Sequence, residues 1–204
     1  MDSNKWQIAT AIDPNYDGGI NAYSASEVSL DSGDLVIRSD AAGASYLSGR
    51  VNMLSGVRYG KIEVRAKLPG TQGMWPAIWL LPKNGSWPPE IDAMELLGSD
   101  PRRVYMTAHW GNRRHPQQDQ SSFTGPDFTS DYHIFSIEWD RKSVRWLIDG
   151  VEQKVITRHV PNKPMYLIMN TSVGGDWPGD PDASTSFPQE FRIDYVRIYQ
   201  HPGK

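Results

Sequence analysis

Three carboxylates fall within six residues of otherwise apolar sequence, in the segment Glu90-Ile91-Asp92-Ala93-Met94-Glu95. A carboxylate that is removed from water destabilises a protein unless it is paired or used chemically. On a regular β-strand, Glu90 and Asp92 share one face while Glu95 points to the other. An extra residue in a β-bulge, which we place at Met94, returns Glu95 to the face of the other two acids. We therefore predict a bulged strand with three acids on one surface; a solvated edge strand is the simpler alternative.

Carboxylates grouped in this way suit the hydrolysis of glycosidic bonds by double displacement. In retaining glycosidases one carboxylate attacks the anomeric carbon and another protonates the leaving oxygen, with the two groups about 5 to 5.5 Å apart. The middle acid, Asp92, can hold and polarise a neighbour, so that one glutamate stays ionised while the other keeps its proton. The segment therefore has the residue types for a divided acid and nucleophile pair.

Tryptophan is unusually frequent, with eight residues in a chain of 204. Four of them lie beside Gly or Pro in loop-like sequence: Trp75-Pro76, Trp87-Pro88, Trp110-Gly111 and Trp177-Pro178. Trp139 and Trp146 lie in apolar, strand-like sequence, and we expect them in the core. A loop tryptophan provides a flat surface with a polar edge. Such surfaces fit a flat ligand that carries hydroxyl groups, such as a sugar ring.

Length and composition exclude several classes of protein. The chain is long enough to bury a substantial core, and we expect a single catalytic domain over residues 1–204. The formal net charge is -3 and the basic residues are scattered, which argues against nucleic acid as the main ligand. No apolar run approaches the roughly 20 residues of a membrane span, and the chain has no cysteine. Its start lacks the features of a signal peptide, which predicts a cytoplasmic protein or the mature form of an exported one.

Strands must position these side chains. In residues 61–68 apolar side chains alternate with charged ones, which is typical of a strand with one face on a core. Further short strands are predicted at 28–30, 35–37, 46–53, 77–81, 104–109, 133–139, 143–148, 151–157, 165–170 and 191–199. With no long amphipathic helix and no repeat, this pattern predicts an all-β protein, an antiparallel β-sandwich. We expect the first thirty residues to be irregular and residues 111–131 to form a long polar loop.

Several motifs resemble glycoside hydrolase family 16. The central one is Glu-x-Asp-x-x-Glu, present as Glu90, Asp92 and Glu95. The supporting segments are Tyr59-Gly60-Lys61-Ile62-Glu63-Val64-Arg65, Gly73-Met74-Trp75-Pro76-Ala77-Ile78-Trp79, Val173-Gly174-Gly175-Asp176-Trp177-Pro178-Gly179 and Asp194-Tyr195-Val196-Arg197-Ile198-Tyr199. Their order and spacing agree over nearly the whole chain, so the resemblance is specific.

The resemblance implies a concanavalin-like β-jelly roll with a concave cleft for a polysaccharide. It makes Glu90 the nucleophile, Asp92 the assisting acid and Glu95 the general acid/base. The bulged motif separates the chain from the plant-type and bacterial lichenase branch, which lacks the extra residue. The loop at 174–179 looks most like that of the laminarinases, which cut internal β-1,3-glucosidic bonds. The implied substrate is laminarin or a mixed-linkage β-glucan.

The resemblance also implies residues that line the cleft. Trp75, Trp79 and Trp177 look like sugar platforms, although Trp79 is equally suited to the core. Arg50 and Asn170 resemble groups that hold glucose hydroxyls near the cleavage point. His109 is expected to reach the reacting sugar or to be structural, and Trp110 is a platform or a loop anchor. His109 and His115 have no spacing that defines a metal site.

No cofactor is expected for catalysis, but many family members carry a structural calcium on the convex face. Gly33, through its carbonyl, and Asp194 match two ligand positions of that site, and calcium prefers oxygen ligands. Relatives usually have a further strand before Lys5-Trp6 that supplies a backbone ligand. The expected partner is the β-glucan itself, with no nucleic acid or membrane, and the protein is expected to be a monomer. Because such polymers do not cross membranes, we expect it to act outside the cell.

Two other functions stay open at this point. The first is a retaining hydrolase of a marine galactan such as agarose, carrageenan or porphyran, for which Arg113-Arg114 would supply the basic groups that a sulfated polymer requires. The second is a sugar-binding module without activity, because lectins share this architecture and a fold alone does not determine function. A module of this kind predicts the loss of at least one of the three acids, and all three are present.

Overall fold

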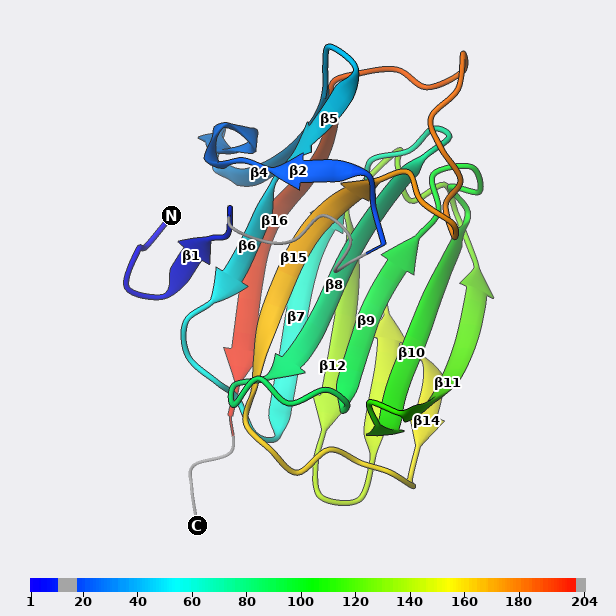
Figure 1. Ribbon diagram of the computed structural model, residues 1–204. Coiled ribbons are helices and arrows are strands. Elements are labelled where there is room, and N and C mark those ends of the chain that lie inside the picture. The colour runs from blue at the N-terminus through cyan, green and yellow to red at the C-terminus, as the bar shows by residue number, and fades with distance from the viewer. Residues whose placement is uncertain (11–17, 201–204) are drawn as a thin grey trace.

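Two β-sheets packed face to face make up the computed structural model, which describes residues 1–10 and 18–200 (Figure 1). The seven-stranded sheet has the order β1-β6-β15-β8-β9-β10-β11. Its strands are β1 (Trp6–Ile8), β6 (Arg50–Met53), β8 (Met74–Pro82), β9 (Glu90–Leu96), β10 (Arg103–Asn112), β11 (His115–Thr124) and β15 (Met165–Val173). All of its strand pairs are antiparallel.

The second sheet has nine strands in the order β14-β13-β12-β7-β16-β4-β5-β2, with β3 paired to β4. Its strands are β2 (Asn21–Tyr23), β3 (Val28–Asp31), β4 (Asp34–Ala42), β5 (Ser45–Ser48), β7 (Gly60–Lys67), β12 (His133–Trp139), β13 (Val144–Ile148), β14 (Val151–Ile156) and β16 (Gln189–Tyr199). One short 3-10 helix, η2 (Ala25–Glu27), precedes β3. The predicted β-sandwich of the jelly-roll type is confirmed.

The core lies between the sheets and follows from the alternation in the sequence. In β7, Ile62, Val64 and Ala66 are buried, while Lys61 and Glu63 are half-buried and form an ion pair on the outer face. Both tryptophans that we expected in the core, at 139 and 146, are buried there. Among the described residues, no helix has the length and hydrophobicity that a membrane span needs.

The hairpin of β3 and β4 shows how the sequence sets a turn. Ser32 and Gly33 both have positive φ, 53° and 98°, as a two-residue turn of type I′ requires. The predicted hairpin over residues 28–39 is therefore confirmed, with register Leu30 opposite Leu35.

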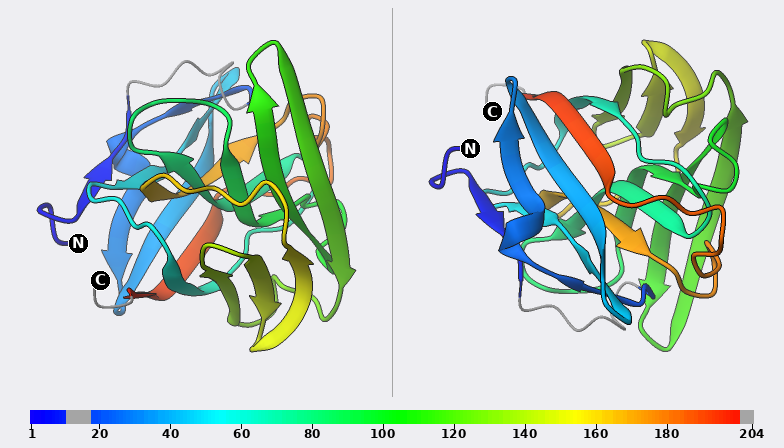
Figure 2. Two further views of the ribbon diagram at one scale, coloured as in Figure 1. Left: turned by 90° about the horizontal axis from the view of Figure 1, so that it is seen from below. Right: turned by 90° about the horizontal axis from the view of Figure 1, so that it is seen from above.

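Two expectations about irregular segments were wrong. The described residues among the first thirty contain β1, β2 and η2, while residues 11–17, which belong to the same prediction, lie outside the described part of the chain. Residues 111–131 do not form a long loop, because β10 continues to Asn112 and β11 returns beside it over ten residues. This hairpin stands at the edge of the seven-stranded sheet (Figure 2). Most of β11 is exposed on both faces, so its polar sequence lacks the alternation that identifies a half-buried strand.

Candidate active site

The bulge in β9 is present, and the pairing register locates it. Asp92 lies opposite Trp79 of β8 and Thr107 of β10. The next aligned pairs are Met94 with Ile78, and Glu95 with Tyr105. The bulge therefore comprises Ala93 and Met94. The residue without a partner on β8 is Ala93 and not Met94, as we had placed it, because Met94 still pairs with Ile78.

Side chains on β9 divide between core and cleft as the bulge dictates. Ala93 and Met94 both pack in the core, in the same cluster as Ile91. Asp92 and Glu95 line one hollow together with Glu90. Two consecutive inward residues reset the alternation, so the third acid returns to the face of the first two.

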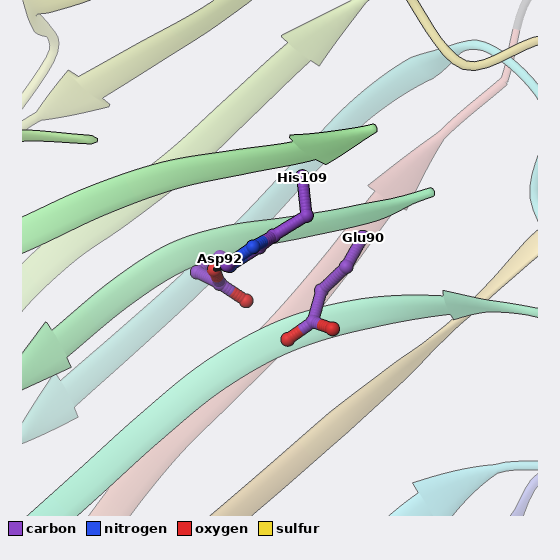
Figure 3. A group of neighbouring side chains, drawn as sticks. All are labelled: Glu90, Asp92 and His109. Atoms are coloured by element: carbon purple, nitrogen blue, oxygen red, sulfur yellow. Dashed lines mark hydrogen bonds and ion pairs between the residues drawn. The ribbon is translucent and has the colours of Figure 1, made fainter. Parts of the chain in front are cut away.

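Glu90, Asp92 and His109 converge from neighbouring strands (Figure 3). Ligand atoms of these three side chains all lie within 4.8 Å of one another. The imidazole Nε2 of His109 lies 3.0 Å from Oδ2 of Asp92. Burial lowers the pKa of His109, with the charge of Glu90 opposing the effect. Burial therefore favours the neutral imidazole, and its Nε2 shares a hydrogen bond with the Asp92 carboxyl.

Two tryptophans hold the outer glutamates. The indole Nε1 of Trp87 donates to Oε2 of Glu90, and that of Trp75 donates to Oε1 of Glu95 over 3.1 Å. A single N–H donor at each carboxylate fixes its rotamer and favours its charged form. We had named Trp87 only as a loop residue. Its position three residues before Glu90 was the available signal for this role.

Burial raises the pKa of all three acids. The pKa of Glu95 rises to about 8, mainly through burial and then through the charge of Glu90, with the N–H of Trp75 opposing. Burial and the charge of Asp92 hold the pKa of Glu90 well above its usual range, while His109 and the N–H of Trp87 lower it. Burial and the charge of Glu95 raise the pKa of Asp92. Because three close carboxylates cannot all ionise in such a site, Glu95 keeps a proton at neutral pH.

Two adjoining hollows expose these acids to a ligand. A hollow of about 90 Å³ is lined by Trp75, Ala77, Trp79, Glu90, Asp92, Glu95, Asn170 and Ser172. A wider one of about 340 Å³ is lined by Trp79, Trp87, Glu90 and Arg113. Both contain Glu90 and Trp79, so they form one continuous cleft with tryptophan along its walls. Arg113 reaches this cleft from the turn between β10 and β11.

Asn170 and Arg50 lie beneath Trp79. Asn170 is 3% exposed; its Oδ1 accepts from the indole of Trp79 at 2.7 Å, and its Nδ2 donates to Tyr23 and Ser172. The guanidinium of Arg50 lies 5.0 Å from the Trp79 ring centre and is also 3% exposed. In this structure both residues support Trp79, and only Asn170 also lines the smaller hollow.

The remaining predicted tryptophans lie at different distances from the acids. Trp177 is 37% exposed and packs edge-on against Trp75 and Tyr105, so it extends the wall at the Glu95 end. Trp110 stacks on His159 with ring centres 4.6 Å apart, and it lines a separate hollow of about 530 Å³. Neither hollow beside the acids includes Trp110.

The predicted calcium ligands do come near each other. The pairing of Ile193 with Leu35 brings the turn that contains Gly33 beside Asp194. Arg65, however, already donates to the Asp194 carboxylate at 2.6 Å. Within residues 1–10 and 18–200, the only group of three or more acidic or histidine side chains suited to an ion is Glu90, Asp92 and His109. Gly33 and Asp194 alone do not supply the roughly six to eight oxygens that calcium takes, so calcium binding there stays a prediction.

Comparison with known proteins identifies relatives over most of the chain. The model of "Glycosyl hydrolases family 16" matches residues 16–197. Glucan endo-1,3-beta-glucosidase A1 of Niallia circulans is 37% identical over 183 residues, which are 77% of this chain and 27% of that protein. A beta-glucanase of Rhodothermus marinus is 38% identical over 167 residues, 70% of this chain and 57% of that protein. The chain thus covers 27% of the length of the first of these relatives and 57% of the length of the second.

The fold has equally clear counterparts among solved structures. The laminarinase catalytic domain of Thermotoga maritima superposes with a TM-score of 0.89 at 35% identity. The match covers 100% of this chain and 94% of that domain. The similarity therefore extends over both sheets and includes the strands that carry the three acids.

Proposed function

Because the chain belongs to family 16 of the glycosyl hydrolases, we propose that it cleaves internal β-1,3-glucosidic bonds in laminarin-type or mixed-linkage β-glucans, with retention of configuration. The observation that carries this proposal is the bulge, which sets Glu90, Asp92 and Glu95 on one surface of a tryptophan-walled cleft. The similarity to the endo-1,3-beta-glucosidase of Niallia circulans supports cleavage within the polymer. We further propose that the enzyme acts outside the cell, where the polymer is.

In the first step Glu90 attacks the anomeric carbon of the bound sugar. The bond from that carbon to the bridging oxygen breaks, and the oxygen takes the proton that Glu95 holds at neutral pH. The N–H of Trp87 stabilises the carboxylate of Glu90 before it attacks. The product of this step is a sugar esterified to Glu90 and a free chain end.

In the second step a water molecule attacks the same carbon. Glu95, now a carboxylate, takes a proton from that water as the ester bond to Glu90 breaks. Asp92, held by His109, places a further negative charge beside Glu90. That charge stabilises the positive charge that develops on the anomeric carbon as the ester bond to Glu90 breaks, and the bond electrons leave with the Glu90 carboxylate.

Reducing-sugar release from laminarin, lichenan, agarose and carrageenan, measured side by side, tests the substrate. We expect laminarin to be cut into a ladder of oligosaccharides and lichenan to be cut more slowly. Glu90→Ala should abolish hydrolysis, and with an activated glycoside added azide should restore turnover with an inverted product. Normal turnover by Glu90→Ala would refute the assignment of the nucleophile.

A galactan hydrolase is the second candidate, and one observation favours it. Arg113 lines the wider hollow beside Glu90, and none of the ion pairs between described residues includes it. A free guanidinium there suits a sulfate or carboxylate substituent on the sugar. Faster release from carrageenan than from laminarin would replace the first proposal by this one.

A further inference from the structure

The backbone carbonyl of Asp92 lies where the ladder of β9 is interrupted by the bulge. It accepts a hydrogen bond of 2.8 Å from the indole Nε1 of Trp146. Trp146 belongs to β13 of the opposite sheet and is completely buried, so this bond crosses the interior of the sandwich. A bulge disrupts the regular ladder, and a buried carbonyl requires a donor. Trp146 supplies that donor at the first peptide of the bulge.

A second irregularity, in the pairing of β13 with β14, helps to hold Trp146 in place. In the pairing of β13 with β14, Trp146 lies opposite Lys154, but the next residue, Leu147, lies opposite Glu152. Gln153 is therefore an extra residue, and Lys154 turns inward. Its ammonium lies 5.5 Å from the centre of the Trp146 ring. A cation over the ring favours this position of the indole.

Lys154 is itself tied to the seven-stranded sheet. Only 4% of its side chain is exposed, and its Nζ lies 2.7 Å from both the carbonyl oxygen and Oδ1 of Asp119. It also contacts Oγ of Ser121 at 3.3 Å. A buried ammonium with three oxygen partners has little freedom to move. Asp119, Lys154 and Trp146 thus connect the edge strand β11 to the bulge through the interior.

We infer that Trp146 is a positioning residue, whose indole N–H orients the peptide after Asp92 and thereby sets Glu95 relative to Glu90. The inference rests on the proposed function, because retaining hydrolysis depends on the separation of those two carboxyl groups. Among the described residues, the indole N–H of Trp146 donates to the Asp92 carbonyl and to neither glutamate, so it acts through the backbone. A displacement of about 1 Å in a catalytic group can reduce the rate about 100-fold.

The test compares Trp146→Phe with Trp139→Phe. Trp139 is also buried, and its Nε1 donates to the carbonyl of Pro161 at 2.9 Å, so both variants lose one buried indole hydrogen bond to a backbone carbonyl. For Trp146→Phe we expect kcat on laminarin to fall about 10- to 100-fold with KM changed by less than about 2-fold. For Trp139→Phe we expect kcat within about 2-fold of wild type.

A substrate that needs no acid separates positioning from general loss of structure. With dinitrophenyl β-laminaribioside, azide should accelerate Trp146→Phe and give a product of retained configuration, because azide attacks the sugar on Glu90 without help from Glu95. Wild type and Trp139→Phe should not be accelerated. Equal kcat values and equal azide responses of the two variants, at a temperature where both are folded, would overturn the inference.

Two further measurements keep the test decisive. If Trp146→Phe does not fold, Lys154→Met is used, which keeps Trp146 but removes the ammonium that holds its indole; it must show the azide response, and the absence of that response would overturn the inference. If wild type is inactive on laminarin and on the glycoside, the proposed function fails, and carboxyl NMR then reports on Glu95 directly. Trp146→Phe should move the titration midpoint of Glu95 by about one pH unit, and an unchanged midpoint would overturn the inference.

Discussion

Replacing Glu95 by glutamine should stabilise the folded protein, and the gain should grow with pH. The pKa of this carboxyl is about 8 in the folded protein, against 4.5 for an ordinary glutamate. The contribution of this carboxyl to the free energy of unfolding is fully present below about pH 4.5. It is lost as the pH rises towards 8, because Glu95 ionises in the unfolded chain before it ionises in the folded protein. From about pH 5 to about pH 7 the loss is at most about 2.5 kcal/mol. Since Glu90 and Asp92 compete for the same protons, we expect about 1 to 2 kcal/mol.

Urea unfolding followed by tryptophan fluorescence measures this effect. The free energy of unfolding is determined at about pH 5 and about pH 7 for wild type, Glu95→Gln and Glu152→Gln. Glu152 is an exposed carboxylate of β14 that pairs with Arg145, and its removal should leave the pH dependence of wild type intact. Glu95→Gln should lose less stability than wild type between the two pH values. The same loss in both proteins would refute the reasoning that burial keeps Glu95 protonated.

Three further predictions concern activity. The kcat/KM of wild type should fall as the pH rises through about 8, because Glu95 must carry a proton to act as the acid, and a pH-rate profile that stays flat to about pH 9 would contradict this. Trp87→Phe removes the N–H that lowers the pKa of Glu90, so the acid limb of the same profile should move to higher pH; an unmoved limb would show that the bond does not tune the nucleophile. Deletion of Ala93 converts the bulged spacing into a regular strand with Glu95 still on the cleft face, so laminarin hydrolysis should remain measurable. An extra alanine after Met94 instead turns Glu95 towards the core, and kcat should fall about 100- to 10,000-fold.

Much of the fold could be predicted because its strands are half-buried. The alternation of Ile62, Val64 and Ala66 with charged residues identifies both the strand and the face that meets the core. The turn at Ser32-Gly33 sets the register of its hairpin in the same way. The strand β11 could not be found by this signal, since neither of its faces is buried for most of its length.

The site was predictable where it depends on spacing along one strand. Three acids around one extra residue define the bulge, although only the register shows that Ala93 is the residue left unpaired. Trp87 lies three residues before the acid that it contacts, but Trp75 and Trp146 come from other strands, and nothing in their spacing specifies a carboxylate or a carbonyl as the partner. The prediction that Trp146 lies in the core was correct, but it did not include the hydrogen bond from the indole N–H to the carbonyl of Asp92.

The strand that the sequence failed to reveal has a consequence for solubility. As the last strand of its sheet, β11 has one edge without a neighbouring strand among the described residues; Lys154 occupies only the carbonyl of Asp119 there, and such an edge invites pairing with another chain. Its composition opposes that outcome: Pro116 lacks one donor, and Gln, Ser, His and Asp make up most of the strand, with Thr124 as its one β-branched residue. The polar residues and the proline that make β11 resemble a loop in the sequence thus also protect the protein from edge-to-edge aggregation.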